Sequence, residues 1–178
     1  MTPSEPASAL PPYHVSVPRT ARYYVIGKPR DTVRDLWIAC HGFSQLARDF
    51  AEPLRTLEDD TRLIVVPEAL SRFYLDSHPT RTHASKIGAT WMTREDREAE
   101  IDDIVTYLDA LYERMLEELA AEGASRDRMR VHALGFSQGA TAVARWAARG
   151  SAVVDHIVAW GHGIPVDVNL RALTERRP

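Results

Sequence analysis

The pentapeptide at residues 135–139, Gly-Phe-Ser-Gln-Gly, places one serine between two glycines in the pattern G-x-S-x-G. The run RVHAL before it is apolar and of strand length, and GATAVARWAAR after it has a helical pattern. This context predicts a sharp strand-to-helix turn that presents the serine hydroxyl above the edge of a sheet. We therefore interpret Ser137 as a candidate nucleophile for acyl transfer, with glycines where side chains would collide with the neighbouring strand and helix.

An acyl-transfer site also needs two N–H donors for the oxyanion of the tetrahedral intermediate. In this type of turn the residue after the nucleophile supplies one donor, which here is Gln138. An earlier strand-to-helix loop supplies the other, and His41-Gly42-Phe43 directly follows the apolar run LWIAC. Phe43 is therefore the candidate second donor. The alternative interpretation is that His41-Gly42 only ends a strand.

The elements that must position these residues alternate along the chain. Five apolar runs bounded by turn residues have strand length, and runs of this kind are typical of a buried parallel sheet: ARYYVIG, DLWIACHG, RLIVVPEA, RVHALGF and DHIVAWG. Between them we expect a short helix within residues 44–60, a long helix from about Arg94 to Ala121, and a helix from Ser137 to about Arg149. The alternation predicts an α/β layer architecture with a mostly parallel central sheet.

The long helix has the clearest period, with apolar residues at i, i+3, i+4 and i+7 from Ile101 to Leu119. Thr93 is the expected N-cap and Gly123 the expected stop. Residues 1–20 hold five of the eleven prolines and are expected to form an irregular arm of a single domain spanning residues 1–178. Residues 70–92 have no clean period and are expected to form an irregular loop near the active site.

These motifs resemble the α/β-hydrolase superfamily, and within it the phospholipase/carboxylesterase family that includes acyl-protein thioesterases. The residues that carry the resemblance are HGF after an early strand, GFSQG at the turn, and the stretch between them from Pro67-Glu68-Ala69 to Gly88-Ala89-Thr90-Trp91. The resemblance implies a three-layer sandwich and hydrolysis of carboxylic esters or thioesters by a Ser-His-Asp triad, without metal or cofactor. It also implies that Trp91 lies near the acyl pocket.

Phe73 is a second candidate for the wall of an apolar substrate pocket. The expected substrate is a small-molecule acyl ester, and the expected activity is that of a serine esterase, carboxylesterase or lysophospholipase. A second hypothesis is a non-catalytic α/β-hydrolase-like scaffold that binds an acyl ligand or a protein partner.

The motifs described so far do not include a base that could activate Ser137. The family order is nucleophile, acid, histidine, and the resemblance places both partners well beyond the strand that ends near Gly161. We therefore expect a C-terminally shortened hydrolase that lacks the last strands of the sheet, and an inactive form is one of the outcomes considered. Within the chain, His162 is a possible base, because it follows the C-terminal end of a strand, and Asp167 is a possible orienting acid. The exposed sheet edge would favour a homodimer that covers it.

Composition excludes several other classes. The net charge of -3 gives no indication of a basic surface for nucleic acid. The sequence contains no run of eighteen apolar residues, so it does not predict a membrane span. Cys40 lies in an apolar run and is expected to be buried, which suits a reducing, cytoplasmic location without disulfides. His78 and His83 have a loose metal-like spacing, but no second motif supports a metal site.

Overall fold

The computed structural model describes residues 10–169 and residue 171. Residues 10–22 form neither helix nor strand, as expected for the proline-rich arm. The part of that arm before residue 10 and most of the charged C-terminal tail lie outside the described residues. Among the described helices, none has both the length and the apolar composition needed to cross a bilayer.

The central sheet has five strands in the spatial order β1-β3-β2-β6-β7. Strand β1 is antiparallel to β3, and the other neighbours are parallel, which confirms the mostly parallel sheet. The parallel register sets Cys40 opposite Gly135, so the chain leaves β2 and β6 at the same edge of the sheet. The strands are β1 (Tyr23–Ile26), β2 (Asp35–Cys40), β3 (Arg62–Pro67), β6 (Arg130–Phe136) and β7 (His156–Trp160).

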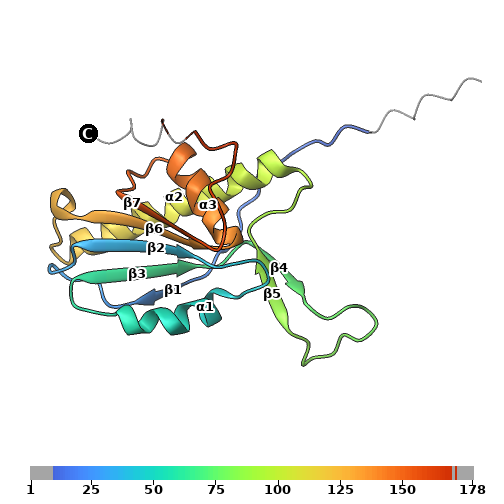
Figure 1. Ribbon diagram of the computed structural model, residues 1–178, viewed down its shortest axis with the longest axis horizontal. Coiled ribbons are helices and arrows are strands. Elements are labelled where there is room, and N and C mark those ends of the chain that lie inside the picture. The colour runs from blue at the N-terminus through green and yellow to red at the C-terminus, as the bar shows by residue number, and fades with distance from the viewer. Residues whose placement is uncertain (1–9, 170, 172–178) are drawn as a thin grey trace, which may run out of the picture.

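Helices cover both faces of this sheet, which gives the expected three layers (Figure 1). On one face α1 (Ala47–Leu54) packs Phe50 and Ala51 against Ile64 of β3. On the other face α2 (Arg97–Ala121) and α3 (Gln138–Arg149) bury the larger core cluster. Single 3-10 turns follow α1 at Arg55–Leu57 and precede β6 at Arg126–Arg128.

The long helix confirms the predicted buried stripe but not the predicted start. Helix α2 begins at Arg97 because Asp96 has a left-handed backbone (φ 48°), which interrupts the helix before that point. Thr93 is not the N-cap, because Asp96 occupies that position; the Thr93 hydroxyl instead accepts a hydrogen bond from the Glu95 amide at 3.2 Å in a local turn. Gly123 follows the C-cap with φ +85°, as expected for a helix stop.

Residues 70–92 correct a second expectation, because they are only partly irregular. Strands β4 (Ser71–Tyr74) and β5 (Ile87–Thr90) pair antiparallel as a separate hairpin that extends away from the main sheet (Figure 1). Each strand has four residues, too few for a period-2 pattern to emerge from the sequence. The connection from residue 75 to 86 has no helix or strand, as predicted.

Candidate active site

Ser137 stands between the last residue of β6 and the first residue of α3. Its backbone angles of φ 51° and ψ -117° lie outside the regions that a side chain normally allows. The Ser137 amide donates to the Trp160 carbonyl at the end of β7, with 2.7 Å between nitrogen and oxygen. No described residue forms a hydrogen bond with the Ser137 hydroxyl. A strained, half-buried serine at a strand-to-helix turn has the backbone geometry of a nucleophile elbow.

The two flanking glycines are required by close backbone approach. A Cβ atom on Gly135 would lie 2.4 Å from the backbone nitrogen of Ala140 in α3. A Cβ atom on Gly139 would lie 2.1 Å from the Cys40 carbonyl oxygen at the end of β2. Both distances are far below van der Waals contact. The G-x-S-x-G pattern therefore has the steric purpose expected from the sequence.

The Gln138 side chain ties this turn to the end of β5. Its Oε1 accepts hydrogen bonds from the Trp91 amide at 3.0 Å and lies 3.1 Å from the Thr90 hydroxyl. Its Nε2 donates to the Met92 carbonyl at 2.7 Å. Every polar atom of the amide is therefore bonded. The glutamine immobilises the first residue of α3 through its side chain and leaves its backbone amide free for another task.

The two candidate oxyanion donors lie in the loop after β2 and directly after Ser137. No described residue accepts a hydrogen bond from the N–H of Phe43 or of Gln138, the two donors that the sequence proposes. In the loop after β2, the Gly42 amide donates to the Gln45 side chain at 2.8 Å and the Ser44 amide to a β5 carbonyl at 2.9 Å. Phe43 is the residue between these two fixed neighbours. The Gln138 amide opens α3, where the helix dipole favours negative charge.

His41 is fully buried, and its ring holds the loop after β2 through two hydrogen bonds. Its Nδ1 donates to the Gly42 carbonyl at 2.8 Å, and its Nε2 accepts from the Ala69 amide at 3.1 Å. These partners define the neutral tautomer with the proton on Nδ1. Burial lowers the pKa of His41, which also favours the neutral ring. His41 therefore shapes the loop and has no nitrogen free for proton transfer.

The two expected pocket residues occupy different environments. The Phe73 ring stacks on the exposed Phe43 ring, with 5.3 Å between centroids, so both aromatics lie beside the proposed oxyanion loop. Trp91 is only 4% exposed, and its indole N–H donates to the His41 carbonyl at 2.8 Å. Trp91 also lines a cavity of about 640 Å³ between the N-terminal arm and α2, and neither Ser137 nor Phe73 borders that cavity.

His162 follows β7 at the same edge of the sheet as Ser137. Gly161 lies beside the serine, with its Cβ position 3.9 Å from the Ser137 nitrogen. The Nδ1 of His162 donates to the Gly163 carbonyl at 2.9 Å, which leaves Nε2 as the acceptor nitrogen of the neutral ring. Asp167, the acid considered for this histidine, binds Arg145 through both carboxylate oxygens.

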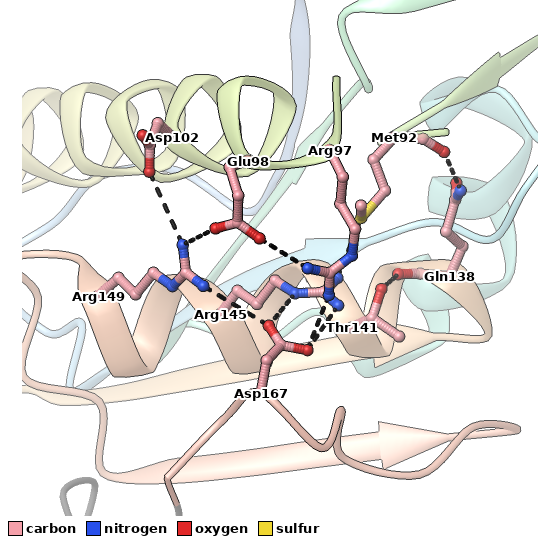
Figure 2. Close-up of polar contacts among 9 residues, drawn as sticks. All are labelled: Met92, Arg97, Glu98, Asp102, Gln138, Thr141, Arg145, Arg149 and Asp167. Carbon is pink, nitrogen blue, oxygen red and sulfur yellow. Dashed lines mark hydrogen bonds and ion pairs between the residues drawn. The ribbon is translucent and has the colours of Figure 1, made fainter. Parts of the chain in front are cut away.

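This arginine–aspartate pair is a feature that the sequence analysis missed (Figure 2). Arg145 is 5% exposed, and its two hydrogen bonds to Asp167 measure 2.9 and 3.1 Å. Hydrogen bonds from Arg145 hold the pKa of Asp167 well below its usual range. Arg97 adds a bond of 2.9 Å, and Arg149 approaches to 3.7 Å. An arginine among the alanines of a predicted buried helix face was the available signal, since such a charge requires a partner.

Glu68 is a second missed residue and is 1% exposed. Arg22 binds both of its oxygens at 2.7 and 2.9 Å, and Arg72 binds one at 3.0 Å. Burial acts to raise the pKa of Glu68, but the two arginines outweigh it, so the pKa lies below its ordinary value. Glu68 also accepts from the Ala47 amide at 3.3 Å and thereby joins the end of β3 to α1 and β4.

The remaining cysteine and histidine candidates are either buried in the core or exposed without other metal-ligating residues in the described part of the chain. Cys40 is buried as expected, and burial raises the pKa of its thiol. His132 is a buried histidine whose Nε2 lies 2.7 Å from a carboxylate oxygen of Asp35. His78 and His83 are exposed, and the described part of the chain has no group of three residues arranged to hold a metal ion.

Solved structures with the same arrangement decide the fold. A phospholipase/carboxylesterase from Dyadobacter fermentans matches with a TM-score of 0.52 and 20% identity, over 85% of this chain and 64% of that one. Zea mays acyl-protein thioesterase 2 matches with a TM-score of 0.52 and 16% identity, over 89% of this chain and 69% of that one. The chain has an α/β-hydrolase-like fold. No protein-family model and no curated protein sequence matches it.

On an α/β-hydrolase-like fold, the elbow after β6 and the loop after β2 are the sites of the nucleophile and of the oxyanion amides. In this chain Ser137 and Gln138 follow β6, and Phe43 lies in the loop after β2. The chain spans less than two thirds of the length of the Dyadobacter protein. At these identities the likeness is one of fold, so the chemistry has to be argued from the site itself.

Proposed function

We propose that this protein is a serine hydrolase of small carboxylic esters that works through an acyl-enzyme on Ser137. The observation that carries the proposal is the pairing of a strained Ser137 (φ 51°) with amides of Phe43 and Gln138 that no described residue occupies. Two proteins of similar structure, a phospholipase/carboxylesterase and an acyl-protein thioesterase, agree with this class of substrate.

In the proposed reaction, Ser137 Oγ forms a bond to the ester carbonyl carbon and the carbonyl oxygen becomes the oxyanion. The amides of Phe43 and Gln138 donate to that oxygen, and one such donor typically contributes about 3 kcal/mol to transition-state stabilisation. The bond to the leaving alkoxide then breaks, and the alkoxide takes up the proton that the serine lost. Water then adds to the acyl carbon through a second oxyanion, the bond to Ser137 Oγ breaks, and the serine recovers the proton that the water gives up as the acid leaves.

We propose His162 as the base that carries this proton. Its position after β7 and its hydrogen bond to the Gly163 carbonyl support the assignment, because that bond holds Nδ1 as the donor and directs the lone pair to Nε2. A backbone carbonyl would thus take the orienting part that a carboxylate takes in other triads. Asp167 is excluded from that part by its bonds to Arg145.

The acyl group of the substrate is proposed to lie against the stacked rings of Phe43 and Phe73. Phe43 is 55% exposed beside the oxyanion loop, so an apolar chain there would remove aromatic surface from water. Trp91 supports the loop from the buried side through His41. The buried Cys40 suits a reducing compartment, and a cytoplasmic location is part of the proposal.

Hydrolysis of p-nitrophenyl esters tests the proposal. We expect turnover by the unaltered chain, loss of turnover in Ser137→Ala, and loss in His162→Ala, with each variant shown to be folded by circular dichroism. Undiminished turnover in Ser137→Ala would defeat the enzyme assignment. Unchanged turnover in His162→Ala alone would remove the histidine from the mechanism and leave the serine in place.

A non-catalytic scaffold is the second candidate, and the observation that favours it is the absence of a carboxylate bonded to His162 among the described residues. In that case the chain would bind a p-nitrophenyl ester without hydrolysing it. Equilibrium dialysis against the ester, in the same samples, separates binding without turnover from no interaction.

We also propose a homodimer formed along β7. This strand pairs with β6 on one side, and no described strand pairs with its other edge. Val158 is 40% exposed and Trp160 61% exposed, so apolar surface accompanies the open edge. Light scattering after gel filtration should give the mass of a dimer for the unaltered chain and of a monomer for Val158→Lys; a monomer in both cases would reject this interface.

A further inference from the structure

We infer that the ion pair between Arg145 and Asp167 positions Gln138, and through it the amide side of the proposed oxyanion site, by way of Met92. This inference rests on the proposed function and names positioning residues for it. Neither Arg145 nor Asp167 contacts Ser137, so their effect on the reaction would pass through the residues between.

The first link joins Gln138 to Met92. The Gln138 Nε2 donates to the Met92 carbonyl at 2.7 Å, and the Thr90 hydroxyl lies 3.0 Å from the same oxygen. The orientation of the Gln138 amide group, and so of the residue that opens α3, depends on where this carbonyl is held. Met92 follows β5 and belongs to no helix or strand, so the sheet does not fix it.

The second link joins Met92 to Arg145. The Met92 sulfur lies 3.1 Å from the Arg145 Nη1, so the guanidinium and the thioether are in contact (Figure 2). A thioether is a weak acceptor, and the contact locates the flexible methionine mainly by packing. Arg145 comes from α3, two turns after Gln138, so one helix holds both ends of the connection.

The third link fixes Arg145 itself. Arg145 is only 5% exposed, so its charge needs compensation, and Asp167 provides it with two hydrogen bonds of 2.9 and 3.1 Å. Without the carboxylate, we expect the guanidinium to leave this position for water or for another carboxylate. Glu98 is the nearest candidate in the same network, since it already binds Arg97 and Arg149.

The pair also connects the two halves of the proposed site. Asp167 lies on the segment that carries His162 away from β7, and its bonds to α3 hold that segment over the helix (Figure 2). The same carboxylate therefore anchors the loop of the proposed base and, through Met92, the residue that supplies an oxyanion amide. Substitution of either Arg145 or Asp167 would therefore disturb both the loop of the proposed base and the position of Gln138.

Labelling of Ser137 by a fluorophosphonate tests the inference, because the phosphonyl oxygen occupies the oxyanion position. We expect Asp167→Asn to reduce the second-order labelling rate by about tenfold or more, less than the hundredfold or greater loss typical of removing a donor outright. Glu98→Gln is the matched control, since it removes one negative charge from the same network without touching Arg145. Asp167→Glu should recover part of the rate. Equal rates in the native chain and Asp167→Asn would overturn the inference.

Amide hydrogen exchange keeps the inference testable if the native chain is not labelled at all, an outcome that would count against the proposed function. The Trp91 amide donates to Gln138 Oε1, so it reports whether the connection is intact. We expect faster exchange of this amide in Asp167→Asn than in Glu98→Gln, with the β6 amides exchanging equally in both. Unchanged protection of the Trp91 amide would overturn the inference independently of catalysis.

Discussion

The two sides of Ser137 differ in how completely the structure holds them. On the side of β2 and β5, His41, Gln138 and Trp91 are joined by hydrogen bonds of 2.7–3.1 Å and lie in or next to the core. On the side of β7, Trp160 is 61% exposed, and within the described part of the chain His162 has one hydrogen-bond partner, the carbonyl of the adjacent Gly163.

This difference indicates that the proposed oxyanion side is preorganised and that the base side is not. Amides that are fixed before the substrate arrives need no reorganisation during the reaction, which is the condition under which they stabilise an oxyanion most. A base on an exposed turn has more freedom and less support. We therefore expect the oxyanion amides to stabilise the transition state without moving, and the β7 side to limit how fast the serine is deprotonated.

The largest expected effect is on stability at the elbow. Gly139→Ala would place a Cβ atom 2.1 Å from the Cys40 carbonyl, which cannot move without disturbing β2. We expect a loss of roughly 3 kcal/mol or more in the free energy of unfolding, measured by urea denaturation. Gly163→Ala is the matched control on the β7 side, because its Cβ would meet nothing within 4 Å. Equal stability of the two variants would contradict the comparison.

The next largest effect is the difference in stability cost between the same substitution on the buried strand β3 and on the exposed strand β7. Val65→Thr on β3 buries a hydroxyl in place of a methyl group, and we expect a cost of about 2 kcal/mol. Val158→Thr makes the same chemical change on β7, where Val158 is 40% exposed, and should change stability by less than about 0.5 kcal/mol. Thermal unfolding of both variants at low protein concentration gives the comparison. A large loss in Val158→Thr would mean that β7 is covered in solution.

A smaller effect is expected from the carboxylate that links the two sides. The pKa of Asp167 is lowered in the folded chain, first by its hydrogen bonds from Arg145, so its contribution to stability is complete above the unfolded value of about 3.9. It fades as the pH falls below that value toward the folded-state pKa. Asp167→Asn should cost about 1–2 kcal/mol at pH 7 and less at pH 3. A cost that grows on acidification would contradict the assignment.

The sequence predicted the parts of the fold that depend on local patterns. Alternating apolar runs indicated the sheet, the period of residues 101–119 indicated α2, and the glycines at 135 and 139 indicated the elbow. The start of α2 was wrong because one left-handed residue, Asp96, decides it, and the β4–β5 hairpin was missed because each strand is too short to show a period.

The rest of the site depends on contacts between distant residues, which no local pattern contains. Arg145 binds Asp167, which lies 22 positions away in the sequence, and Arg22 binds Glu68, which lies 46 positions away. A buried charge in a predicted core helix shows that a partner must exist, but it does not say which one. For this reason the sequence suggested His162 as the partner of Asp167, whereas in the structure three arginines converge on that carboxylate.

The most direct test of the central claim is the intact mass of the folded protein after reaction with a fluorophosphonate. In this reaction a bond forms between Ser137 Oγ and phosphorus while the bond to fluoride breaks. The account predicts one added phosphonyl group, located on Ser137 by fragmentation and absent from Ser137→Ala. A folded chain that gains no mass, or that gains it equally in Ser137→Ala, would contradict the claim that this elbow presents a reactive serine.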